Sequence, residues 1–377
     1  MELRSAPSGP LAFTARVLDG RITATDLSRA EAEALAAAWS RCDPRLTAAD
    51  AVAAEDRHGS LARRPQQGWA SFHEELVYTA TSRAIASGRG ELLMFHAAAL
   101  ADPVTGRAIA LVAESGTGKT TATRTLGRSF AYLTDETVAV DAARGIRPFP
   151  KPLSILPASG RRPKDQAAPD ELGLLPAVDR SVLWRVAVLD RLAGRERAVA
   201  RRLPLAEALE HLSPQISGLA WLDRGLVRLC STLHACGGAL RLEYGEATQL
   251  AELARDLLAA PPADEPGDAW APLDLSRSET PADPALLQYR RIVPADAVRI
   301  STGSTEAVAV LKGEALTVLH GLGPLLWGAA SAWRTTEELL ETVVAAAGDH
   351  PQARELLDAH VADLVGHGLL EASREVD

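Results

Sequence analysis

The sequence has few basic residues and few aromatic residues. Its 40 Lys and Arg residues are outnumbered by 49 Asp and Glu residues, which gives a net charge of −9. Because binding to a phosphate backbone depends on clustered basic residues, this balance predicts no nucleic-acid partner. Aromatic residues make up only 4% of the chain, but 47% of it is hydrophobic. The 377 residues can therefore still bury real cores, and the length suggests two or three domains.

Cysteines and long apolar segments are also scarce. The three cysteines, Cys42, Cys230 and Cys236, lack the spacing of metal ligands, and we interpret them as thiols of a reducing compartment. No run of about 18 apolar residues is free of charge, so the sequence predicts no membrane span. The start of the chain lacks a basic segment followed by a long apolar one, which argues against a signal peptide. We therefore expect a cytoplasmic protein.

One boundary is visible in the composition. Residues 257–287 are dense in Pro, Asp, Ala and Ser and show no sustained periodicity. We predict an N-terminal domain over 1–260, with 1–85 as a subregion. A proline-rich linker over 261–285 and a second domain over 286–377 follow.

Hydrophobic periodicity predicts both helices and strands in the N-terminal domain. An apolar run at 92–100, a turn at 102–106 and a second apolar run at 107–113 predict a β-hairpin. Further helices are expected over 26–40, 72–87, 204–212 and 246–259, and further strands over 136–140 and 182–189. Mixed helices and strands of this kind predict the α/β class.

The hairpin leads into AESGTGKT, which fits the phosphate-binding P-loop pattern with Ala113 in place of its first glycine. Glycines let the backbone approach a phosphate closely, and the N–H groups of such a loop bind its oxygens. Lys119 would neutralise phosphate charge, and the Thr120 hydroxyl would coordinate Mg²⁺. We therefore predict ATP and Mg²⁺ as cofactors; an ordinary strand–turn–helix connection is the alternative. The predicted nucleotide-binding residues are Ser115, Gly116, Thr117, Gly118, Lys119, Thr120 and Thr121.

Two acidic residues and a histidine flank this loop. Asp135 and Glu136 begin 16 residues after Lys119, and His96 lies in the apolar run before the hairpin. Phosphoryl transfer needs a positioned metal and a residue that accepts the proton of the attacking hydroxyl. If the strands are neighbours, Asp135 would be that base, Glu136 would help to hold Mg²⁺, and His96 would orient or polarise Asp135. Taken singly, the acids also fit a solvated turn and the histidine fits a hydrogen-bonded core position.

The stretch FHAAALAD, followed by GRAIALVAESGTGKTT and YLTDETVAV, resembles the bacterial HPr kinase/phosphorylase family. That family has a histidine strand, a hairpin, a GxSGxGKS-type loop and paired acids in this order, on a fold similar to phosphoenolpyruvate carboxykinase. The resemblance implies catalytic roles for His96, Lys119 and Asp135. The chain departs from the family at Glu136, where Asp is usual, and at Ala97, where Gly is usual. The family's C-terminal signature, tied to phosphorolysis, is not recognisable, so the resemblance implies a kinase but not HPr as its substrate.

Lysine is rare enough to be singled out, because most cations of this chain are arginines. The four lysines are Lys119, Lys151, Lys164 and Lys312. Lys151 lies in the proline-stiffened stretch RPFPKPLSI, and the basic stretch SGRRPKD follows. We predict that Lys151, Arg161 and Arg162 contact phosphate groups of the substrate or the nucleotide. A solvated loop is the alternative for Arg161, Arg162 and Lys164.

The C-terminal segment has short strands followed by three helix candidates, at 321–330, 335–348 and 351–371. Apolar residues at helical spacing predict its core: Trp327, Leu339, Val343, Leu357, Val361 and Leu364. The pieces VAVLKGEALTVLHGLGPLLW, RTTEEL and LVGHGLLE resemble the PqqD-like domain of ribosomal peptide biosynthesis. The resemblance implies that a leader peptide adds as a strand, here through residues 306–311 and 352–366. The alternative is a winged-helix module for DNA binding or dimerisation, and the acidic balance argues against DNA.

Together the two resemblances imply an HPr kinase/PEP carboxykinase-like P-loop domain of the α/β class, followed by a small α+β, winged-helix-like PqqD domain. We expect an ATP-dependent kinase that phosphorylates a hydroxyl, most simply a serine, of a precursor peptide such as those of lasso peptide pathways. Two alternatives stay open. One is a kinase for a protein serine or a small hydroxy metabolite. The other is a non-catalytic ATP-binding protein that presents a peptide to a separate enzyme. The HPr kinase family forms hexamers, so a homo-oligomer is a further expectation.

Overall fold

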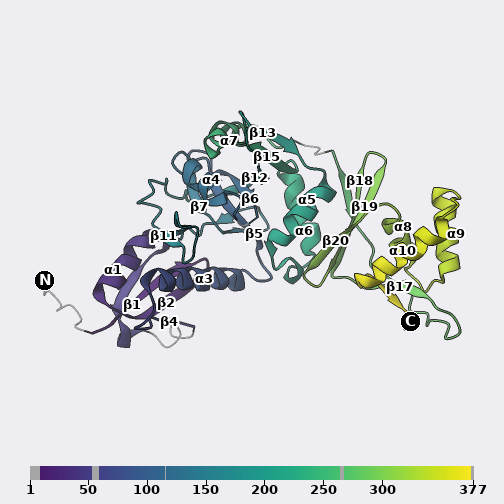
Figure 1. Cartoon of the computed structure of the whole chain (residues 1–377), viewed down its shortest axis with the longest axis horizontal. Helices are drawn as coiled ribbons and strands as arrows, with labels where there is room; N and C mark the ends of the chain where they lie inside the picture. Colours follow the sequence, from purple (N-terminus) through teal and green to yellow (C-terminus); the bar gives the residue numbers. More distant parts are fainter. Residues whose placement is uncertain (1–8, 53–58, 115, 264–266, 375–377) are drawn as a thin grey trace. The chain divides into compact units, whose positions relative to one another are not determined.

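The computed structural model describes residues 9–52, 59–114, 116–263 and 267–374 (Figure 1). This part of the chain mixes helices with several sheets, as the α/β prediction requires. It divides into two compact units. Unit 1 comprises Met1–Leu203, Gln215–Leu222 and Thr232–Asp264, and unit 2 comprises Pro204–Pro214, Asp223–Ser231 and Glu265–Asp377.

The predicted helices are present, but the one expected over 351–371 ends at Gly366, and Leu370 and Glu371 belong to a strand. Unit 1 contains α1 (Arg29–Ala38), α3 (Trp69–Ser87), α4 (Lys119–Leu126) and α7 (Leu250–Ala259). Unit 2 contains α5 (Leu205–Leu212), α8 (Gly323–Ala329), α9 (Thr336–Ala347) and α10 (Ala353–Gly366), and α6 (Gly225–Ala235) has residues in both units. Short 3-10 helices are η1 (Ser40–Cys42), η2 (Ala49–Ala51), η3 (Ser213–Gln215), η4 (Leu219–Trp221) and η5 (Ala247–Gln249). No helix in the described residues is long and apolar enough to span a membrane.

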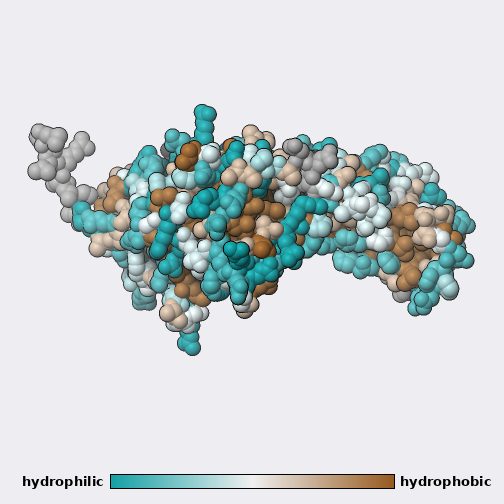
Figure 2. Space-filling view, turned by 90° about the horizontal axis from the view of Figure 1, so that it is seen from above, coloured by the Kyte–Doolittle hydropathy of each residue, from teal (hydrophilic) through white to brown (hydrophobic). Residues whose placement is uncertain are grey.

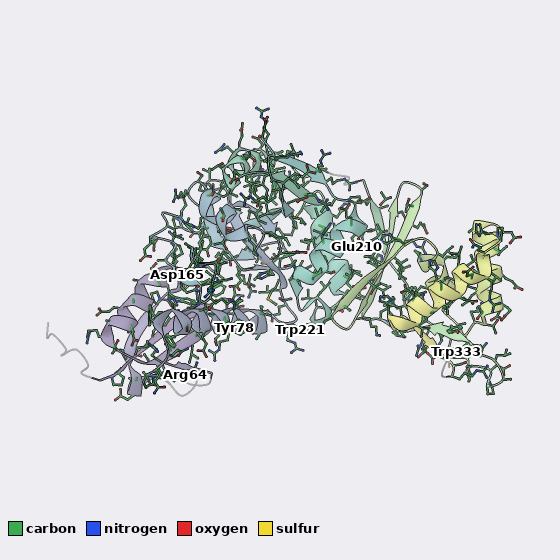
Figure 3. The ribbon with its side chains drawn as sticks, viewed as in Figure 1. Arg64, Tyr78, Asp165, Glu210, Trp221 and Trp333 are labelled. Carbon is green, nitrogen blue, oxygen red and sulfur yellow. The ribbon has the colours of Figure 1, made fainter. Side chains whose placement is uncertain are left out.

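A four-stranded sheet forms the N-terminal part of unit 1. Its order is β3 (Arg45–Ala48), β1 (Leu11–Val17), β2 (Gly20–Leu27) and β4 (Leu61–Ala62). α1 begins at a capping box, in which the Ser28 hydroxyl accepts from the Glu31 N–H and the Glu31 carboxylate accepts from the Ser28 N–H. The apolar faces of α1 and α3 cover this sheet, and the core that they bury includes Phe13 and Phe72. The opposite side of α3 carries Tyr78, which is exposed (Figure 3).

The central sheet of unit 1 contains nine strands among the described residues. Its order is β13 (Val199–Arg202), β15 (Ala239–Tyr244), β12 (Val182–Arg191), β6 (Arg107–Val112), β5 (Leu93–Ala101), β8 (Thr137–Val140) and β9 (Ile146–Arg147). Two more strands, β7 (Ala131–Thr134) and β14 (Ile216–Ser217), also pair with β5. The predicted strands over 136–140 and 182–189 correspond to β8 and β12. A separate hairpin joins β10 (Leu153–Ile155) to β11 (Asp165–Ala167).

The predicted hairpin is confirmed as the antiparallel pair β5 and β6, and it leads directly into the glycine loop and α4. Its turn is held by Asp102, whose Oδ1 accepts from the N–H groups of Val104 and Thr105. β5 pairs with β6 on one side and with β7 and β8 on the other. This pairing brings His96 on β5 near both the loop that follows β6 and the turn between β7 and β8.

Unit 2 is built on a four-stranded antiparallel sheet and three C-terminal helices. The order of the sheet is β16 (Ala269–Pro272), β18 (Asp296–Thr302), β19 (Thr305–Lys312) and β20 (Ala315–Leu319), and β17 (Tyr289–Arg291) pairs with β21 (Leu370–Ala372). All six predicted core residues, Trp327, Leu339, Val343, Leu357, Val361 and Leu364, are buried in one cluster. On the face in Figure 2, hydrophobic residues are also visible at the surface of the C-terminal helical part.

The structure differs from the predicted organisation in the proline-rich segment. The predicted linker, 261–285, contains β16, which pairs with β18. Asp268, just before β16, accepts hydrogen bonds from the Leu205 N–H of α5 and from the Thr302 hydroxyl. Unit 2 therefore includes α5 and part of the predicted linker, and is larger than the predicted domain 286–377. A four-residue strand that contains proline is too short to show the alternation by which strands are recognised.

Candidate active site

The glycine loop joins β6 to α4 in unit 1. Gly116 and Gly118 have φ values of +88° and +100°, which glycine adopts without strain. Space is limited as well, because a Cβ at Gly118 would lie 3.2 Å from the hydroxyl of Tyr244. α4 starts immediately after Gly118, so the positive end of the helix is at the loop. Ser115, a predicted nucleotide-binding residue, lies outside the described residues.

Lys119 is the first residue of α4, and its ammonium approaches two backbone carbonyls. Nζ donates to the carbonyl oxygens of His96 at 3.3 Å and Ala113 at 3.4 Å. Burial lowers the pKa of Lys119 to about 8, although the carboxylates of Asp135 and Glu136 act in the opposite direction. Within the described part of the chain, no carboxylate oxygen forms an ion pair with Lys119. A partly buried ammonium of this kind gains from an anionic ligand.

A pocket of about 380 Å³ brings together residues that are far apart in the sequence. The predicted residues that line it are His96, Gly116, Gly118, Lys119, Thr120, Thr121, Asp135 and Glu136. Thr117 does not line it, because its hydroxyl is turned back to donate to the Glu114 carbonyl at 2.7 Å. The volume suits a small ligand such as a nucleotide. The convergence arises from the pairing of β5 with both β6 and β8.

Asp135 and Glu136 lie at the turn between β7 and β8 and share one buried cation. Lys151 Nζ is 2.8 Å from Asp135 Oδ1 and 3.0 Å from Glu136 Oε2, and the Lys151 side chain is fully buried. The Tyr132 hydroxyl lies 3.1 Å from Asp135 Oδ1 and 3.1 Å from the Lys151 carbonyl oxygen. Burial alone would raise the pKa of Glu136, but Lys151 and a hydrogen bond from Thr81 lower it to about 2. Glu136 is therefore ionised at neutral pH.

His96 lines the same pocket, but its ring forms no hydrogen bond to Asp135 in the described structure. Burial and the nearby charge of Lys119 lower the pKa of His96, so its ring is neutral at pH 7. Asp135 is oriented instead by Lys151 and Tyr132. The predicted role of His96 in orienting or polarising Asp135 therefore stays a prediction.

The three basic residues predicted to contact phosphates lie away from the pocket lining. The Lys151 ammonium is paired with the carboxylates of Asp135 and Glu136 and does not line the pocket. The Arg162 side chain is 75% exposed and pairs with Glu74 of α3 at 3.8 Å. Arg161 is also exposed and does not line the pocket. The loop between β10 and β11 turns Lys164 rather than the two arginines towards the pocket.

Arg124 and Lys164 also line the pocket, although neither is among the predicted site residues. Arg124 follows Thr120 by four positions on α4, and this spacing places both on one helix face. Pairing of Ile155 with Asp165 brings the neighbouring Lys164 back to the pocket. The helical spacing could have identified Arg124, and the rarity of lysine could have favoured Lys164.

The described residues contain no cluster of three or more His, Cys, Asp and Glu side chains that could hold a metal ion. A divalent cation in this pocket would therefore take most of its ligands from phosphate oxygens and water. Thr120 and Glu136, the predicted Mg²⁺ ligands, both line the pocket. Thr120 could suffice for Mg²⁺, which keeps several waters and commonly takes only one or two protein ligands, whereas Glu136 is already paired with Lys151.

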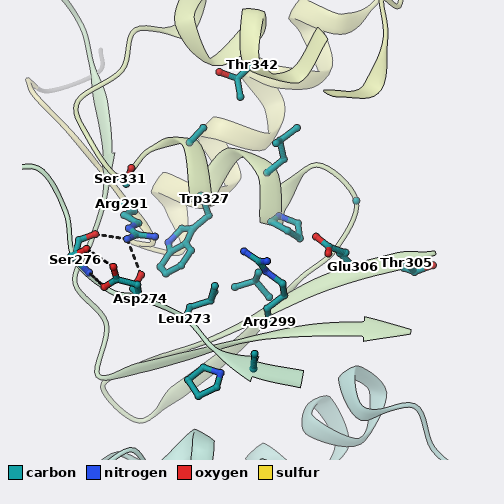
Figure 4. Close-up of a pocket in the computed structure, with 18 of the residues that line it drawn as sticks. Leu273, Asp274, Ser276, Arg291, Arg299, Thr305, Glu306, Trp327, Ser331 and Thr342 are labelled. Carbon is teal, nitrogen blue, oxygen red and sulfur yellow. Dashed lines mark hydrogen bonds between the residues drawn. The ribbon is translucent and has the colours of Figure 1, made fainter. Parts of the chain in front are cut away.

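A larger cavity of about 1120 Å³ lies within unit 2 (Figure 4). Residues of β16, β18 and β19 form one wall, and α8 with Trp327 forms another. At its edge the Arg291 guanidinium stacks 4.8 Å from the Trp327 ring centre. Arg291 also donates to the backbone carbonyls of Asp274 and Ser276. The cavity therefore combines an apolar wall with charged and hydrogen-bonding groups.

The predicted peptide-binding strand, residues 306–311, is not at an edge of the sheet. β19 pairs with β18 on one side and with β20 on the other, so its backbone groups are already used. A peptide cannot add a strand there. Within the described residues the sheet ends at β16 and β20. β20 is not among the predicted strands, although Gly313 at φ +54° marks the tight turn before it.

The other predicted peptide-binding segment, 352–366, includes most of α10. Its apolar residues Leu357, Val361 and Leu364 face the core of unit 2. No residue of this segment lines the described part of the large cavity, whereas Glu306 and Val308 of β19 do.

No known family model matches the chain, and no curated protein matches it in sequence. The resemblances to HPr kinases and to PqqD-like domains therefore remain expectations drawn from short motifs.

Proposed function

We propose that this chain is an ATP-dependent phosphotransferase that acts on a hydroxyl group, most simply a serine side chain of a peptide. The observation that carries the proposal is the convergence of Gly118, Lys119 and Asp135 in one pocket of unit 1. A glycine loop alone would suit any nucleotide-binding protein. A fixed aspartate in the same pocket adds an acceptor for the proton of an incoming hydroxyl.

In this proposal the loop N–H groups and Lys119 would hold the β- and γ-phosphates, and Thr120 would be a ligand of the accompanying Mg²⁺. The hydroxyl oxygen forms a bond to the γ-phosphorus while the bond from that phosphorus to the ADP oxygen breaks. The hydroxyl proton passes to Asp135. Because Lys151 and Tyr132 already hold Oδ1 of Asp135, the carboxylate needs little reorganisation during the reaction.

The remaining lining residues suit this chemistry. Arg124 and Lys164 add positive charge to the pocket where the phosphoryl group would be transferred. The neutral ring of His96 can form a hydrogen bond to the incoming hydroxyl or to a phosphate oxygen. Leu156 also lines the pocket and is 51% exposed, which offers an apolar contact for the substrate.

The cavity of unit 2 favours a peptide over a small metabolite as the substrate. Its volume, about 1120 Å³, exceeds the range of about 300–1,000 Å³ that small molecules usually occupy. Its lining combines apolar residues such as Leu273 and Leu325 with the charged Arg299 and Glu306. Unit 2 would hold one part of the peptide, and tethering would raise the effective concentration of its reactive part at unit 1.

The test uses the full-length chain, ATP, Mg²⁺ and a library of serine-containing peptides, with a second library in which alanine replaces every serine. Intact mass should show added phosphate only on serine-containing peptides. Lys119→Ala and Asp135→Asn should each reduce the rate by roughly 100-fold or more. Matched controls at exposed positions outside the pocket, Lys312→Ala and Asp179→Asn, should leave the rate unchanged.

Binding of a non-hydrolysable ATP analogue, measured by calorimetry, separates the alternatives. Asp135→Asn should still bind the analogue, because Asp135 acts on the hydroxyl and not on the nucleotide. If the wild type binds the analogue but phosphorylates no peptide, the peptide-kinase proposal fails and the presenter alternative gains support. Transfer to the peptide that does not depend on Asp135 would refute its role as the base.

A further inference from the structure

Lys151 is fully buried, and each of its three ammonium hydrogens has an acceptor within reach. Nζ lies 2.8 Å from Asp135 Oδ1, 3.0 Å from Glu136 Oε2 and 3.3 Å from the Pro152 carbonyl oxygen. An ammonium group has three donors, so these contacts satisfy it. Lys151 does not line the pocket, and it is therefore not placed to contact a nucleotide.

The chain around Lys151 fixes the ammonium at this position. The Lys151 N–H donates to the Phe149 carbonyl at 2.9 Å, and the Phe149 N–H donates to the Leu133 carbonyl of β7 at 2.9 Å. The Tyr132 hydroxyl reaches the Lys151 carbonyl oxygen at 3.1 Å. Prolines on both sides of Lys151 restrict its backbone further. The cation is thus a built part of unit 1 and not a mobile surface side chain.

Two carboxylates beside a phosphate-binding loop are a common ligand set for divalent cations. Here Lys151 already bridges one oxygen of Asp135 and one of Glu136. A metal ion bonded to both carboxylates would lie against the ammonium and would be repelled by it. Lys151 also offsets one of the two negative charges of the pair, which further weakens metal binding.

We propose that Lys151 is a built-in cation that takes the place of a divalent metal between Asp135 and Glu136. The pocket then holds a single divalent cation, which arrives with the nucleotide phosphates and is bound at Thr120. The second statement rests on the proposed nucleotide function. The first statement concerns only the acids and stands independently of it.

The test is a titration with Mn²⁺ in the absence of nucleotide, followed by electron paramagnetic resonance of the free ion. Lys151→Met should gain one Mn²⁺ site. Its dissociation constant should be at least roughly tenfold lower than that of any wild-type site that depends on Asp135 and Glu136. Adding Glu136→Gln to Lys151→Met should abolish this site. Lys151→Arg keeps the positive charge and should gain none, and Lys312→Met is the matched control.

Removal of one partner from a buried ion pair is strongly destabilising, so folding of Lys151→Met is first examined by circular dichroism. If the variant is unfolded, saturating Mn²⁺ should restore its spectrum, because the metal replaces the missing cation. A folded variant that gains no site, or an unfolded one that Mn²⁺ does not restore, overturns the proposal. Mn²⁺ binding by the nucleotide-free wild type that is lost in Glu136→Gln and is as tight as that of Lys151→Met overturns it as well.

The stoichiometry with a bound ATP analogue tests the second statement. The wild type should bind one Mn²⁺ per chain together with the analogue, and two would contradict a single-metal pocket. If the analogue does not bind at all, the proposed function fails. The comparison of nucleotide-free wild type with Lys151→Met still decides whether Lys151 excludes a metal.

Discussion

Lys119, Lys151 and Lys164 have the same side chain but different surroundings in unit 1. Lys119 is partly buried near backbone carbonyls, and burial lowers its pKa to about 8. Burial would also lower the pKa of Lys151, but Asp135 and Glu136 raise it above its ordinary value. Lys164 lines the pocket beside the acids. Lys119 and Lys164 therefore face the pocket, whereas Lys151 is paired within the protein.

A buried histidine in unit 1 predicts how stability depends on pH. The His73 ring is 5% exposed, and its Nε2 accepts a hydrogen bond of 3.1 Å from the Trp39 indole N–H. Burial, with a smaller effect of Lys151, lowers the pKa of His73 to about 4, whereas an unfolded histidine has a pKa of about 6.5. Its stabilising contribution is therefore complete above pH 6.5 and is lost as the pH falls towards 4, by about 3 kcal/mol in total.

The measurement is the free energy of unfolding in urea at several values of pH between 7 and 4. His73→Gln keeps an acceptor for Trp39 but does not titrate, and it should show a shallower loss than the wild type. His360→Gln, at a position that is less buried than His73, is the matched control. Equal slopes in all three proteins would show that His73 is not the group responsible.

At the scale of elements, the segment from β6 through the glycine loop to α4 combines a buried strand with a sharp backbone turn. β6 is almost entirely buried, which holds the start of the loop in the sheet. Gly118 then has a φ of +100° at the N-terminus of α4, where the backbone must turn sharply. These two features place a short loop with Gly116 and Gly118 at the lining of one pocket.

Gly118→Ala should therefore reduce the affinity for an ATP analogue by roughly tenfold or more while the fold remains. An alanine at this φ is strained, and its Cβ would lie 3.2 Å from the Tyr244 hydroxyl. Gly366→Ala in α10 is the matched control, because its Cβ would meet no atom within 4 Å. Calorimetric titration of both variants decides the matter, and unchanged affinity in Gly118→Ala would contradict a phosphate-binding loop.

At the scale of the whole molecule, the chain forms two compact units with separate cores and separate cavities. Unit 2 draws residues 204–214 and 223–231 from within the sequence of unit 1. A truncation at residue 286 would therefore cut through unit 2 and would not remove it cleanly. Point substitutions are the appropriate way to test its role.

Trp327→Ala should destabilise unit 2 by about 3–5 kcal/mol, because a large buried side chain is lost. Trp327 is 1% exposed, and its indole N–H donates to the Leu369 carbonyl at 3.2 Å. Trp333 is the control (Figure 3). Its ring stacks 4.3 Å from the Arg290 guanidinium, but it is less buried than Trp327. Trp333→Ala should therefore lower the free energy of unfolding by only about 1 kcal/mol. Urea unfolding measures both, and similar costs would argue against Trp327 as the centre of this core.

Nucleotide affinity in unit 1 provides a second readout for the same variant. Because Trp327 lies in the core of unit 2, Trp327→Ala should leave the affinity for the ATP analogue unchanged within about twofold. A large loss of affinity would show that the two units are coupled.

Local patterns in the sequence determined much of unit 1. The apolar runs and the turn at Asp102 predicted the β5–β6 hairpin, because each strand is buried on both faces and the turn residues are specific. The glycine loop, Lys119 and the acids could be proposed for the same reason, since their spacing along the chain already indicates their chemistry. In unit 2, helical spacing was sufficient to predict a core that includes Trp327.

Only the tertiary structure decided which groups meet. Lys151 reaches Asp135 and Glu136 because β7 and β8 pair with β5 and because the chain after β9 returns to β7. Arg161 and Arg162 are exposed while Lys164 faces the pocket, as the β10–β11 pairing dictates. Local preference depends on neighbours within a few residues, whereas these contacts depend on strand pairing between distant segments. The positions of the motifs were therefore readable from the sequence, and the ion pairs around them were not.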